Sequence, residues 1–295
     1  MTGKITKIGF IGAGKVGSAL ALLLQKSGYE IAGVASRTRA SAADLAGRLH
    51  CPVFSATGVA RTAEALFLTT TDDAIPSVVA GLAQAGAFHA GQIVLHMSGA
   101  LTSEVLKPAA GEGALTLSVH PLQSFASVEQ ALAVLPGSFF SIEGDPRGFS
   151  FAREIVEKLE GKYFFLNAEA KVLYHAAACV ASNYLVGLLA CSLDLLTAAG
   201  IPPEIQLPAL LPLVAGTLDN IRALGIPGSL TGPIARGDLG TLEKHLAALK
   251  DLPEQLQIYA SLGFFTIEVA RAKGTIDAAR AAAIQALLQD AARVT

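Results

Sequence analysis

The stretch that decides the fold is Lys7-Ile8-Gly9-Phe10-Ile11-Gly12-Ala13-Gly14-Lys15-Val16-Gly17, near the start of a chain of 295 residues. It places a Gly-x-Gly-x-x-Gly pattern between an apolar strand and an amphipathic helix. In that setting the first glycine permits a tight turn, the second lets the backbone approach a pyrophosphate, and the third lets the helix pack on the strand. The pattern therefore predicts a dinucleotide-binding turn, with an ordinary glycine turn as the alternative. Its predicted cofactor contacts are Gly12, Ala13, Gly14, Lys15, Val16 and Gly17.

The loop after the second predicted strand indicates which dinucleotide binds. An NAD site usually has Asp or Glu there, on the ribose 2′-hydroxyl, whereas this chain has Ser36-Arg37-Thr38-Arg39. A guanidinium and hydroxyls suit a 2′-phosphate, so we expect Ser36, Arg37 and Thr38 to bind NADP(H), unless the cations simply face solvent.

Two threonines after the next strand belong to the same prediction. Ligands of such sheets lie beyond the carboxyl ends of the strands, so Thr70 and Thr71 should line the cofactor path. At least one of the following residues, Asp72 and Asp73, is expected to cap a helix instead.

Strand and helix patterns alternate through the first half of the chain, which predicts an α/β, doubly wound Rossmann-type domain with a parallel sheet. The predicted strands are 7–11, 30–35, 66–69, 93–96, 116–119, 139–142 and 163–166, and the predicted helices are 15–26, 40–49, 75–85, 103–106 and 149–159. From residue 168 onward only helical patterns occur, beginning with one long helix over 168–199. We therefore predict a dinucleotide-binding domain over 1–167 and an all-helical substrate and dimerisation domain over 168–295.

The composition limits the partners. Hydrophobic residues make up 52% of the chain, charged residues 16%, and the net charge is -2. These values exclude a disordered chain and argue against a nucleic-acid partner. The charge-poor stretches 176–193 and 205–218 could suggest a membrane span, but polar residues in the first and prolines in the second favour a buried core helix or a subunit interface. We expect a homodimer with a small-molecule substrate and no membrane partner.

The N-terminal residues and the cysteines bear on location. Residues 1–7 carry two lysines and no apolar stretch of the kind that secretory signals have, so we expect a cytoplasmic protein. The three cysteines form no C-x-x-C pair, which argues against disulfides and a metal site. We expect them to be buried thiols.

Three polar clusters are candidates for the chemistry. His96 and Ser98 follow one predicted strand, and His120 ends another. On the predicted long helix, offsets of 4 and 11 residues bring Lys171, His175 and Ser182 onto one face, with Asn183 beside them. We predict that Lys171, His175, His120 and Ser98 are catalytic, with Lys171 or His175 donating a proton during hydride transfer, and that His96, Ser182 and Asn183 bind substrate. A solvated helix face or a purely structural hydrogen-bond network is the alternative.

A glycine-rich loop, Leu230-Thr231-Gly232-Pro233-Ile234-Ala235-Arg236-Gly237-Asp238, precedes a predicted helix. Arg236 could bind a substrate carboxylate, because arginine pairs with carboxylates through two parallel hydrogen bonds. Asp238 or Thr241 should cap the following helix.

The motifs at residues 9–17, 96–101, 120–125, 174–178, 181–184 and 230–238 resemble the bacterial proteins that join a Rossmann-like domain to the C-terminal domain of unknown function 2520. The chain is more distantly similar to the 6-phosphogluconate dehydrogenase-like superfamily, which includes pyrroline-5-carboxylate reductase, ketopantoate reductase and deazaflavin-dependent NADP reductases. The resemblance implies a nicotinamide-binding first domain and a helical second domain that dimerises through long helices. It also implies a catalytic lysine on the first long helix, which matches Lys171, with Asn183 as a second match.

Together these observations predict an NADP(H)-dependent oxidoreductase that transfers hydride to or from a small carbonyl, imine or hydroxy compound, one that bears a carboxylate. Two alternatives stay open. One is a non-catalytic NADP(H)-binding sensor or interaction protein, and the other is a deazaflavin-dependent NADP reductase.

Overall fold

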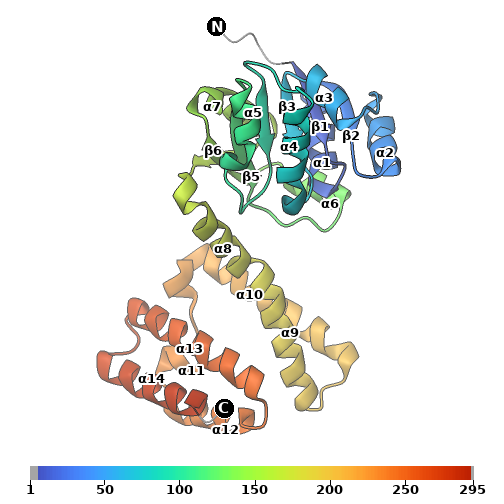
Figure 1. Ribbon diagram of the computed structural model, residues 1–295. Coiled ribbons are helices and arrows are strands. Elements are labelled where there is room, and N and C mark those ends of the chain that lie inside the picture. The colour runs from blue at the N-terminus through green and yellow to red at the C-terminus, as the bar shows by residue number, and fades with distance from the viewer. Residues whose placement is uncertain (1–5, 294–295) are drawn as a thin grey trace. The chain divides into compact units, whose positions relative to one another are not determined.

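The computed structural model describes residues 6–293 and divides the chain into two compact units (Figure 1). The first unit ends at Tyr184 and the second begins at Leu185. The last strand ends at Phe165, close to the expected domain boundary near residue 167. The units nevertheless divide later, because helix α8 (Lys171–Ala181) packs with the first unit.

The first unit is built on a seven-stranded sheet in the order β2-β1-β3-β4-β5-β6-β7. The predicted doubly wound sheet is confirmed, with one difference: β6 runs antiparallel to β5, whereas all the other neighbours are parallel. The segment that joins β5 to β6 starts and finishes at one edge of the sheet, where β5 ends, so β6 runs in the opposite direction to β5. The strands are β1 (Lys7–Ile11), β2 (Glu30–Ala35), β3 (Ala65–Leu68), β4 (Ile93–His96), β5 (Leu115–Pro121), β6 (Phe139–Gly144) and β7 (Lys162–Phe165).

Helices cover both faces of this sheet, so its strands alternate between two apolar layers (Figure 1). Phe10 and Phe67 belong to one layer, and Leu66 and Leu68 to the other. The first layer contains α1 (Lys15–Lys26), α2 (Arg39–Leu49), α6 (Val128–Val134) and α7 (Phe149–Lys158); the second contains α3 (Ala56–Thr62), α4 (Ile75–Gln84), the 3-10 turn η2 (Ser103–Leu106) and α5 (Lys107–Gly111). The sequence prediction missed α3, α5 and α6, because five to seven residues are too few to show a helical period.

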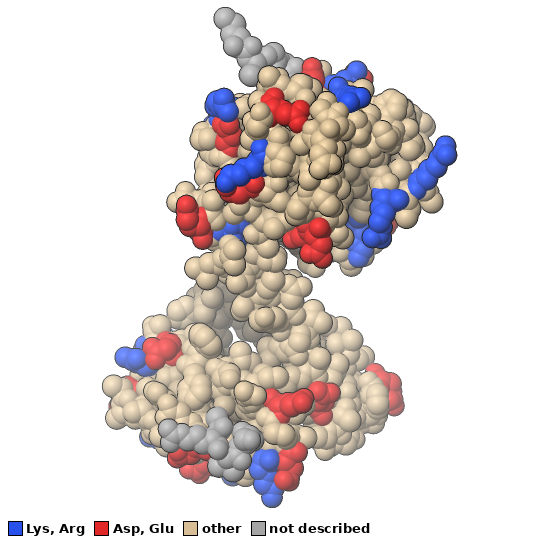
Figure 2. Space-filling view, in the orientation of Figure 1, with Lys and Arg blue, Asp and Glu red and all other residues tan. Residues whose placement is uncertain are grey.

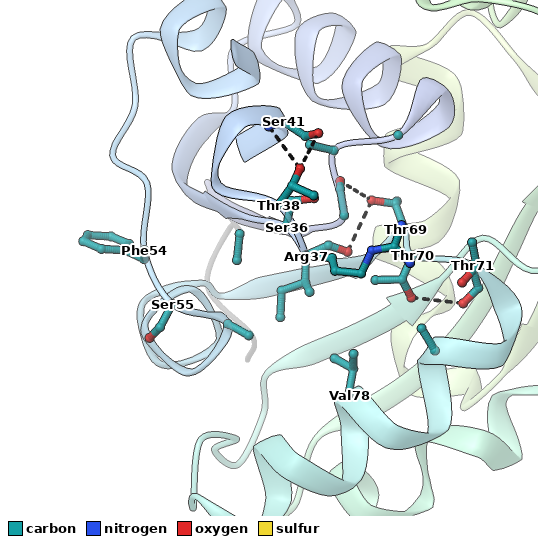
Figure 3. Close-up of a pocket in the computed structure, with 17 residues that line it drawn as sticks. Ser36, Arg37, Thr38, Ser41, Phe54, Ser55, Thr69, Thr70, Thr71 and Val78 are labelled. Carbon is teal, nitrogen blue, oxygen red and sulfur yellow. Dashed lines mark hydrogen bonds between the residues drawn. The ribbon is translucent and has the colours of Figure 1, made fainter. Parts of the chain in front are cut away.

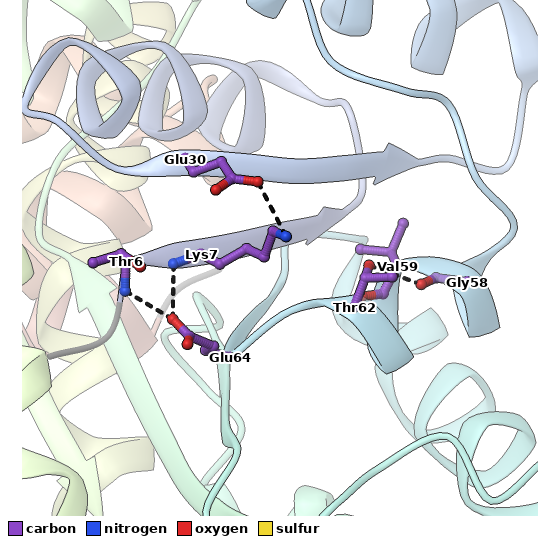
Figure 4. Close-up of polar contacts among 7 residues, drawn as sticks. All are labelled: Thr6, Lys7, Glu30, Gly58, Val59, Thr62 and Glu64. Atoms are coloured by element: carbon purple, nitrogen blue, oxygen red, sulfur yellow. Dashed lines mark hydrogen bonds and ion pairs between the residues drawn. The ribbon is translucent and has the colours of Figure 1, made fainter. Parts of the chain in front are cut away.

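Polar contacts fix the start of β1 within the sheet (Figure 4). The Glu64 carboxylate accepts hydrogen bonds from the backbone N–H groups of Thr6 and Lys7, at 2.8 and 2.9 Å. These backbone donors hold the pKa of Glu64 below its usual value. Lys7 Nζ also lies 3.2 Å from a carboxylate oxygen of Glu30 on β2. The contacts join β1 to the segments on either side of it and so help to set the position of the glycine turn at its other end.

The second unit contains only helices among its described residues, as predicted. Its core joins α12, α13 and α14 through residues such as Leu242, Ala270 and Leu288. Gly263 on α13 allows close packing, because a Cβ there would lie 2.7 Å from a methyl group of Leu288. The helices of this half are α9 (Asn183–Ala198), α10 (Pro203–Ser229), α11 (Pro233–Arg236), α12 (Leu239–Leu249), α13 (Pro253–Lys273) and α14 (Ala278–Arg293).

The prediction of one continuous helix over 168–199 is wrong. The 3-10 turn η4 (Ala168–Ala170) precedes α8, and Ser182, with φ -116° and ψ -66°, separates α8 from α9. Helix α10 is interrupted in the same way at Gly225, where φ is 71° and ψ is 172°. Gly200 has a φ of 77°, as expected of a residue that ends a helix.

These helices carry apolar side chains that the single chain does not cover. Two stretches, Ala168–Ala198 and Pro203–Arg236, are long and apolar enough to cross a membrane by length and composition alone, and almost none of their most apolar residues is buried. The surface over α8 is largely free of charged side chains on the face shown in Figure 2. Of the two alternatives expected for these stretches, a buried core helix is therefore wrong for the single chain, and a subunit interface stays a prediction. The expectation that all three cysteines are buried is wrong for Cys51 and Cys179, which are partly exposed; Cys191 is buried.

Candidate functional site

An open pocket of about 590 Å³ lies at the carboxyl ends of β1, β2 and β3 (Figure 3). The chain order reverses between β1 and β3, and ligands of doubly wound sheets bind at such a point. The lining comes from the turns after these strands, from the segment that begins α3, and from single residues at or near the starts of α2 and α4. It comprises Ile11, Gly12, Ala13, Gly14, Ala35, Ser36, Arg37, Thr38, Ser41, Phe54, Ser55, Ala56, Thr69, Thr70, Thr71, Ala74 and Val78.

The three glycines of the first turn serve different purposes. Gly12 has a φ of 118°, and a Cβ on it would overlap the backbone of Thr69. Gly17 lies against the Thr69 side chain, whose hydroxyl donates a 2.8 Å hydrogen bond to the Gly12 carbonyl. Gly14 has nothing within 4 Å of its Cβ position. Gly12 and Gly17 are therefore required by packing within the protein, whereas Gly14 keeps the pocket open.

The amides that follow Gly14 are suited to an anion. Helix α1 begins there without a side-chain cap, so its first N–H groups are available to a ligand. Of the predicted contacts, Gly12, Ala13 and Gly14 line the pocket, whereas Lys15, Val16 and Gly17 form the first turn of α1 and do not.

The predicted 2′-phosphate contacts Ser36, Arg37 and Thr38 line the pocket with Thr70 and Thr71 (Figure 3). The lining contains no carboxylate, so one guanidinium faces the pocket without an acidic competitor. Thr38 also caps α2: its hydroxyl donates to Ser41 Oγ at 2.7 Å and accepts from the Ser41 N–H. These residues fit a phosphorylated dinucleotide.

Sequence reasoning missed Phe54 and Ser55, which line the pocket beside the predicted residues. The Phe54 ring is 40% exposed and lies against Gly33, where a Cβ would come 2.6 Å from the ring. The available signal in the sequence was an aromatic residue, Phe54, in the connection between α2 and α3. Its place at the pocket depends on tertiary packing.

A second polar region lies around Lys171, the first residue of α8. Its side chain is fully buried, and its Nζ makes no hydrogen bond within residues 6–293. Burial lowers the pKa of Lys171 to about 8, although the carboxylates of Glu143 and Asp72 favour the charged form. A buried amine with this pKa can donate or accept a proton near neutral pH.

The imidazole of His96 is held by backbone groups on both sides. Its Nδ1 accepts from the Ser98 N–H at 3.1 Å, so its Nε2 carries the proton and donates to the Thr102 carbonyl at 3.1 Å. Burial lowers the pKa of His96 to about 4. Both ring nitrogens are therefore occupied, and the geometry favours a structural role over the substrate contact that we expected.

Ser98 is similarly engaged. Its hydroxyl donates to Asp72 Oδ2 at 2.7 Å and accepts from the N–H groups of Ala100 and Leu101. The geometry therefore favours a role for Ser98 in positioning Asp72 over the catalytic role that we expected. At least one of Asp72 and Asp73 was expected to cap a helix, and this prediction is wrong, because neither the 3-10 turn η1 (Asp72–Ala74) nor α4 has a side-chain cap. Asp72 instead accepts the bond from Ser98.

His120 lies beside two side chains of α8. Its Nδ1 is 2.8 Å from the Tyr174 hydroxyl, and its ring meets that of His175 edge to face at 6.0 Å between centroids. Burial lowers the pKa of His120 to about 3, with the Lys171 charge as the next cause, so this ring is neutral near pH 7. Burial also raises the pKa of Tyr174, a residue that the sequence prediction missed. Gly99 completes the contact, because any Cβ there would overlap both histidine rings.

The remaining predicted residues lie elsewhere. Ser182 and Asn183 are exposed at the break between α8 and α9. Arg236 belongs to the second unit, 3.9 Å from Asp238 Oδ2. Asp238 caps α12 through Thr241, as predicted. The first unit thus brings together Lys171, His175, His120, Ser98 and His96. Among the described residues, no group of three or more His, Cys, Asp or Glu side chains could hold a metal ion.

Two family models match successive parts of the chain, and the second begins within the first structural unit, before β6. Residues 2–121 match a Rossmann-like domain, and residues 138–266 match the domain of unknown function DUF2520. The chain is therefore similar to proteins that join these two domains. No curated protein matches it.

Solved structures similar to the chain share its fold. Protein TM1727 from Thermotoga maritima is 29% identical, with a TM-score of 0.74 over 90% of this chain and 99% of that one. BF3122 from Bacteroides fragilis, described as a proposed NADP oxidoreductase, is 24% identical, with a TM-score of 0.70 over 91% and 98% of the two chains. A reductive aminase from Aspergillus terreus, solved with NADPH and ethyl-5-oxohexanoate, is 18% identical, with a TM-score of 0.60 over 98% and 94%.

Proposed function

We propose that this DUF2520 protein is an NADP(H)-dependent oxidoreductase that transfers hydride to or from a small carbonyl, imine or hydroxy compound. The observation that carries the proposal is the pocket at the ends of β1, β2 and β3, which offers uncapped helix amides and Arg37 and contains no carboxylate in its lining. The structural similarity to BF3122 and to the reductive aminase complex supports the same cofactor.

The residues around Lys171 supply the acid-base chemistry in this proposal. NADPH supplies the hydride when it is bound. The ammonium form of Lys171 donates a proton to the oxygen or nitrogen that receives the electron pair and becomes the neutral amine, and its burial excludes competing water. Two neighbouring residues link the pocket to this amine. Thr71 lines the pocket, and the charge of the next residue, Asp72, favours the charged form of Lys171. A carboxylate on the substrate depends on Arg236 and stays a prediction.

The test is an NADPH-oxidation assay with a panel of 2-oxo acids, ketones, and ketones mixed with amines, alongside calorimetry with NADPH and NADH. We expect NADPH to bind more tightly than NADH and at least one carbonyl or imine to be reduced. Tight NADPH binding without turnover of any member would favour the sensor alternative. Turnover only with a reduced deazaflavin would favour the second alternative. Equal affinity for the two nucleotides would contradict the choice of cofactor.

We also propose that a second copy of the chain covers the apolar side chains of α8, α9 and α10. Val172 and Leu173 are 68% and 76% exposed, and Val186 and Leu213 are 69% and 67% exposed. A bilayer suits these helices less well, because three prolines lie inside α10 and the ion pair Asp219–Arg222 lies on it. Sedimentation in detergent-free buffer should show a stable dimer. A monomer, or a protein that needs detergent to stay in solution, would contradict this proposal.

We further propose a cytoplasmic location. The three cysteines are free thiols, as is usual in a reducing compartment.

A further inference from the structure

Five polar residues form a patch on one face of the otherwise apolar sheet. His96 on β4 pairs with Ser118 on β5, and Ser118 pairs with Glu143 on β6, so the three form a row across neighbouring strands about 4.8 Å apart. His120 and Ser141 form the next row on the same face, because directly paired residues share a face and alternate residues return to it. His96, Ser118, Ser141 and Glu143 are all buried.

Within this patch, the Glu143 carboxyl group is fixed by one serine. Its Oε1 accepts from the Ser103 hydroxyl at 2.7 Å, and its Oε2 accepts from the Ser103 N–H at 2.8 Å. Ser103 thus donates to both oxygens of the carboxyl group and fixes its orientation. A buried carboxylate of this kind requires a cation nearby, because its removal from water is costly.

The chain path brings Lys171 to this carboxylate. The Leu166 N–H bonds to the Ile142 carbonyl at 2.9 Å, so the polypeptide leaves the sheet beside Glu143. One 3-10 turn later α8 begins at Lys171, whose buried Nζ makes no hydrogen bond within the described residues. Neither carboxylate near Lys171 comes within 4.0 Å of its Nζ, so their charges stabilise the ammonium without fixing it in an ion pair.

Residues 96–103 tie these parts together. The His96 ring is hydrogen-bonded to the Ser98 N–H and to the Thr102 carbonyl within this segment. Ser98 donates a hydrogen bond to Asp72, and Ser103 donates one to Glu143. Two serines of one short segment thus fix two carboxylates from two other elements. Asp72 is exposed to solvent, whereas Glu143 is 4% exposed, so the charge of Glu143 is the less screened.

We propose that Glu143 is the positioning residue that keeps Lys171 in the ammonium form, and that residues 96–103 fix its carboxylate for this purpose. The inference deepens the proposed function, in which Lys171 donates the proton. The charged and titratable groups that act on Lys171 or its neighbours are Glu143 on β6, Asp72 on η1, His96 on β4, and His120 on β5 with His175 on α8. His96 and His120 are neutral near pH 7, so Glu143 is the main buried countercharge.

The experiment is a pH titration of lysine side chains by NMR, in full-length protein that carries labelled lysine. The Lys171 signal is assigned by its loss in Lys171→Met. The natural protein should titrate near pH 8 at this lysine. In Glu143→Gln the midpoint should fall by about one pH unit, because an opposite charge has been removed. Glu157→Gln, which removes an exposed carboxylate on α7, is the matched control and should leave the midpoint unchanged. An unchanged midpoint in Glu143→Gln would overturn the inference.

A stability comparison covers the case in which Glu143→Gln does not fold. Lys171→Met leaves Glu143 buried without its cation, so adding Glu143→Gln to that variant should raise the denaturant concentration at the midpoint of unfolding. An equal or lower midpoint in the double variant would contradict the inference. Neither measurement uses catalysis. A shifted Lys171 titration in a protein that reduces no member of the substrate panel would therefore retain this inference and reject the proposed function.

Discussion

The cofactor pocket and the Lys171 region lie at neighbouring strand ends of one sheet. Polar groups are open to a ligand in the first and are hydrogen-bonded within the protein in the second. In the pocket, the α1 amides and the Arg37 guanidinium face open space. Around Lys171, the polar groups of His96, Ser98 and Glu143 are bonded to other groups of the protein and removed from solvent. The difference suits a nucleotide that binds and leaves in the first region, and a proton donor whose charge is set in advance in the second.

Replacement of Lys171 by alanine should have the largest effect. If this amine donates the proton, turnover in the NADPH assay should fall by about 10²–10⁴-fold, while calorimetry shows unchanged NADPH affinity. His175→Ala should also lose turnover, through the contact of its ring with His120. Retained turnover in both variants would show that the Lys171 region does not carry out the chemistry.

Gly12→Ala and Gly14→Ala form a matched pair within the pocket. Gly12→Ala should lower the free energy of unfolding by about 2–4 kcal/mol, because the new Cβ meets the Thr69 backbone at a positive φ. Gly14→Ala should change that energy by less than about 0.5 kcal/mol, because its Cβ position is open, but it should weaken NADPH binding. Urea denaturation and calorimetry measure the two effects. Equal loss of stability in both variants would show that the two glycines do not differ as described.

Arg37→Ala tests which nucleotide the pocket selects. Loss of a charge-assisted contact should weaken NADPH binding by about 10- to 100-fold and leave NADH binding unchanged. Arg39→Ala is the control, since Arg39 begins α2 two residues after Arg37 and does not line the pocket. Calorimetry that finds equal losses in the two variants would point to general charge attraction instead of a specific phosphate contact.

The pH dependence of reduction should show the smallest effect. Lys171 is protonated below its pKa of about 8 and loses the proton above it. The value of kcat/KM for reduction should therefore be level below pH 8 and fall about tenfold for each further pH unit. Oxidation of the product should show the opposite trend. A profile that is flat across this range would remove Lys171 from the proton-transfer step.

The same contrast explains what the sequence could predict. The glycine turn and the Ser36-Arg37-Thr38 loop are local patterns, and they were assigned to a pocket that the structure contains. Glu143, Tyr174 and Phe54 come from three distant segments and have no local pattern, so their places depend on strand pairing and helix packing. His96 was expected to bind substrate because it ends a strand whose carboxyl end should face the cofactor crevice. Its two backbone partners become visible only in the folded chain.

The register of the antiparallel pairing between β5 and β6 decides where Glu143 lies, and therefore, in the proposal above, the protonation state of Lys171. A slip of one residue in that pairing would turn Glu143 from the polar face of the sheet into the apolar layer on the opposite side. The pairing ends at Gly144, whose φ is 127° and whose Cβ position is blocked by the Thr116 carbonyl. Gly144 does not line the pocket, yet the proposed proton donor depends on it. A side chain at this position would displace β6 and so move Glu143 away from Lys171.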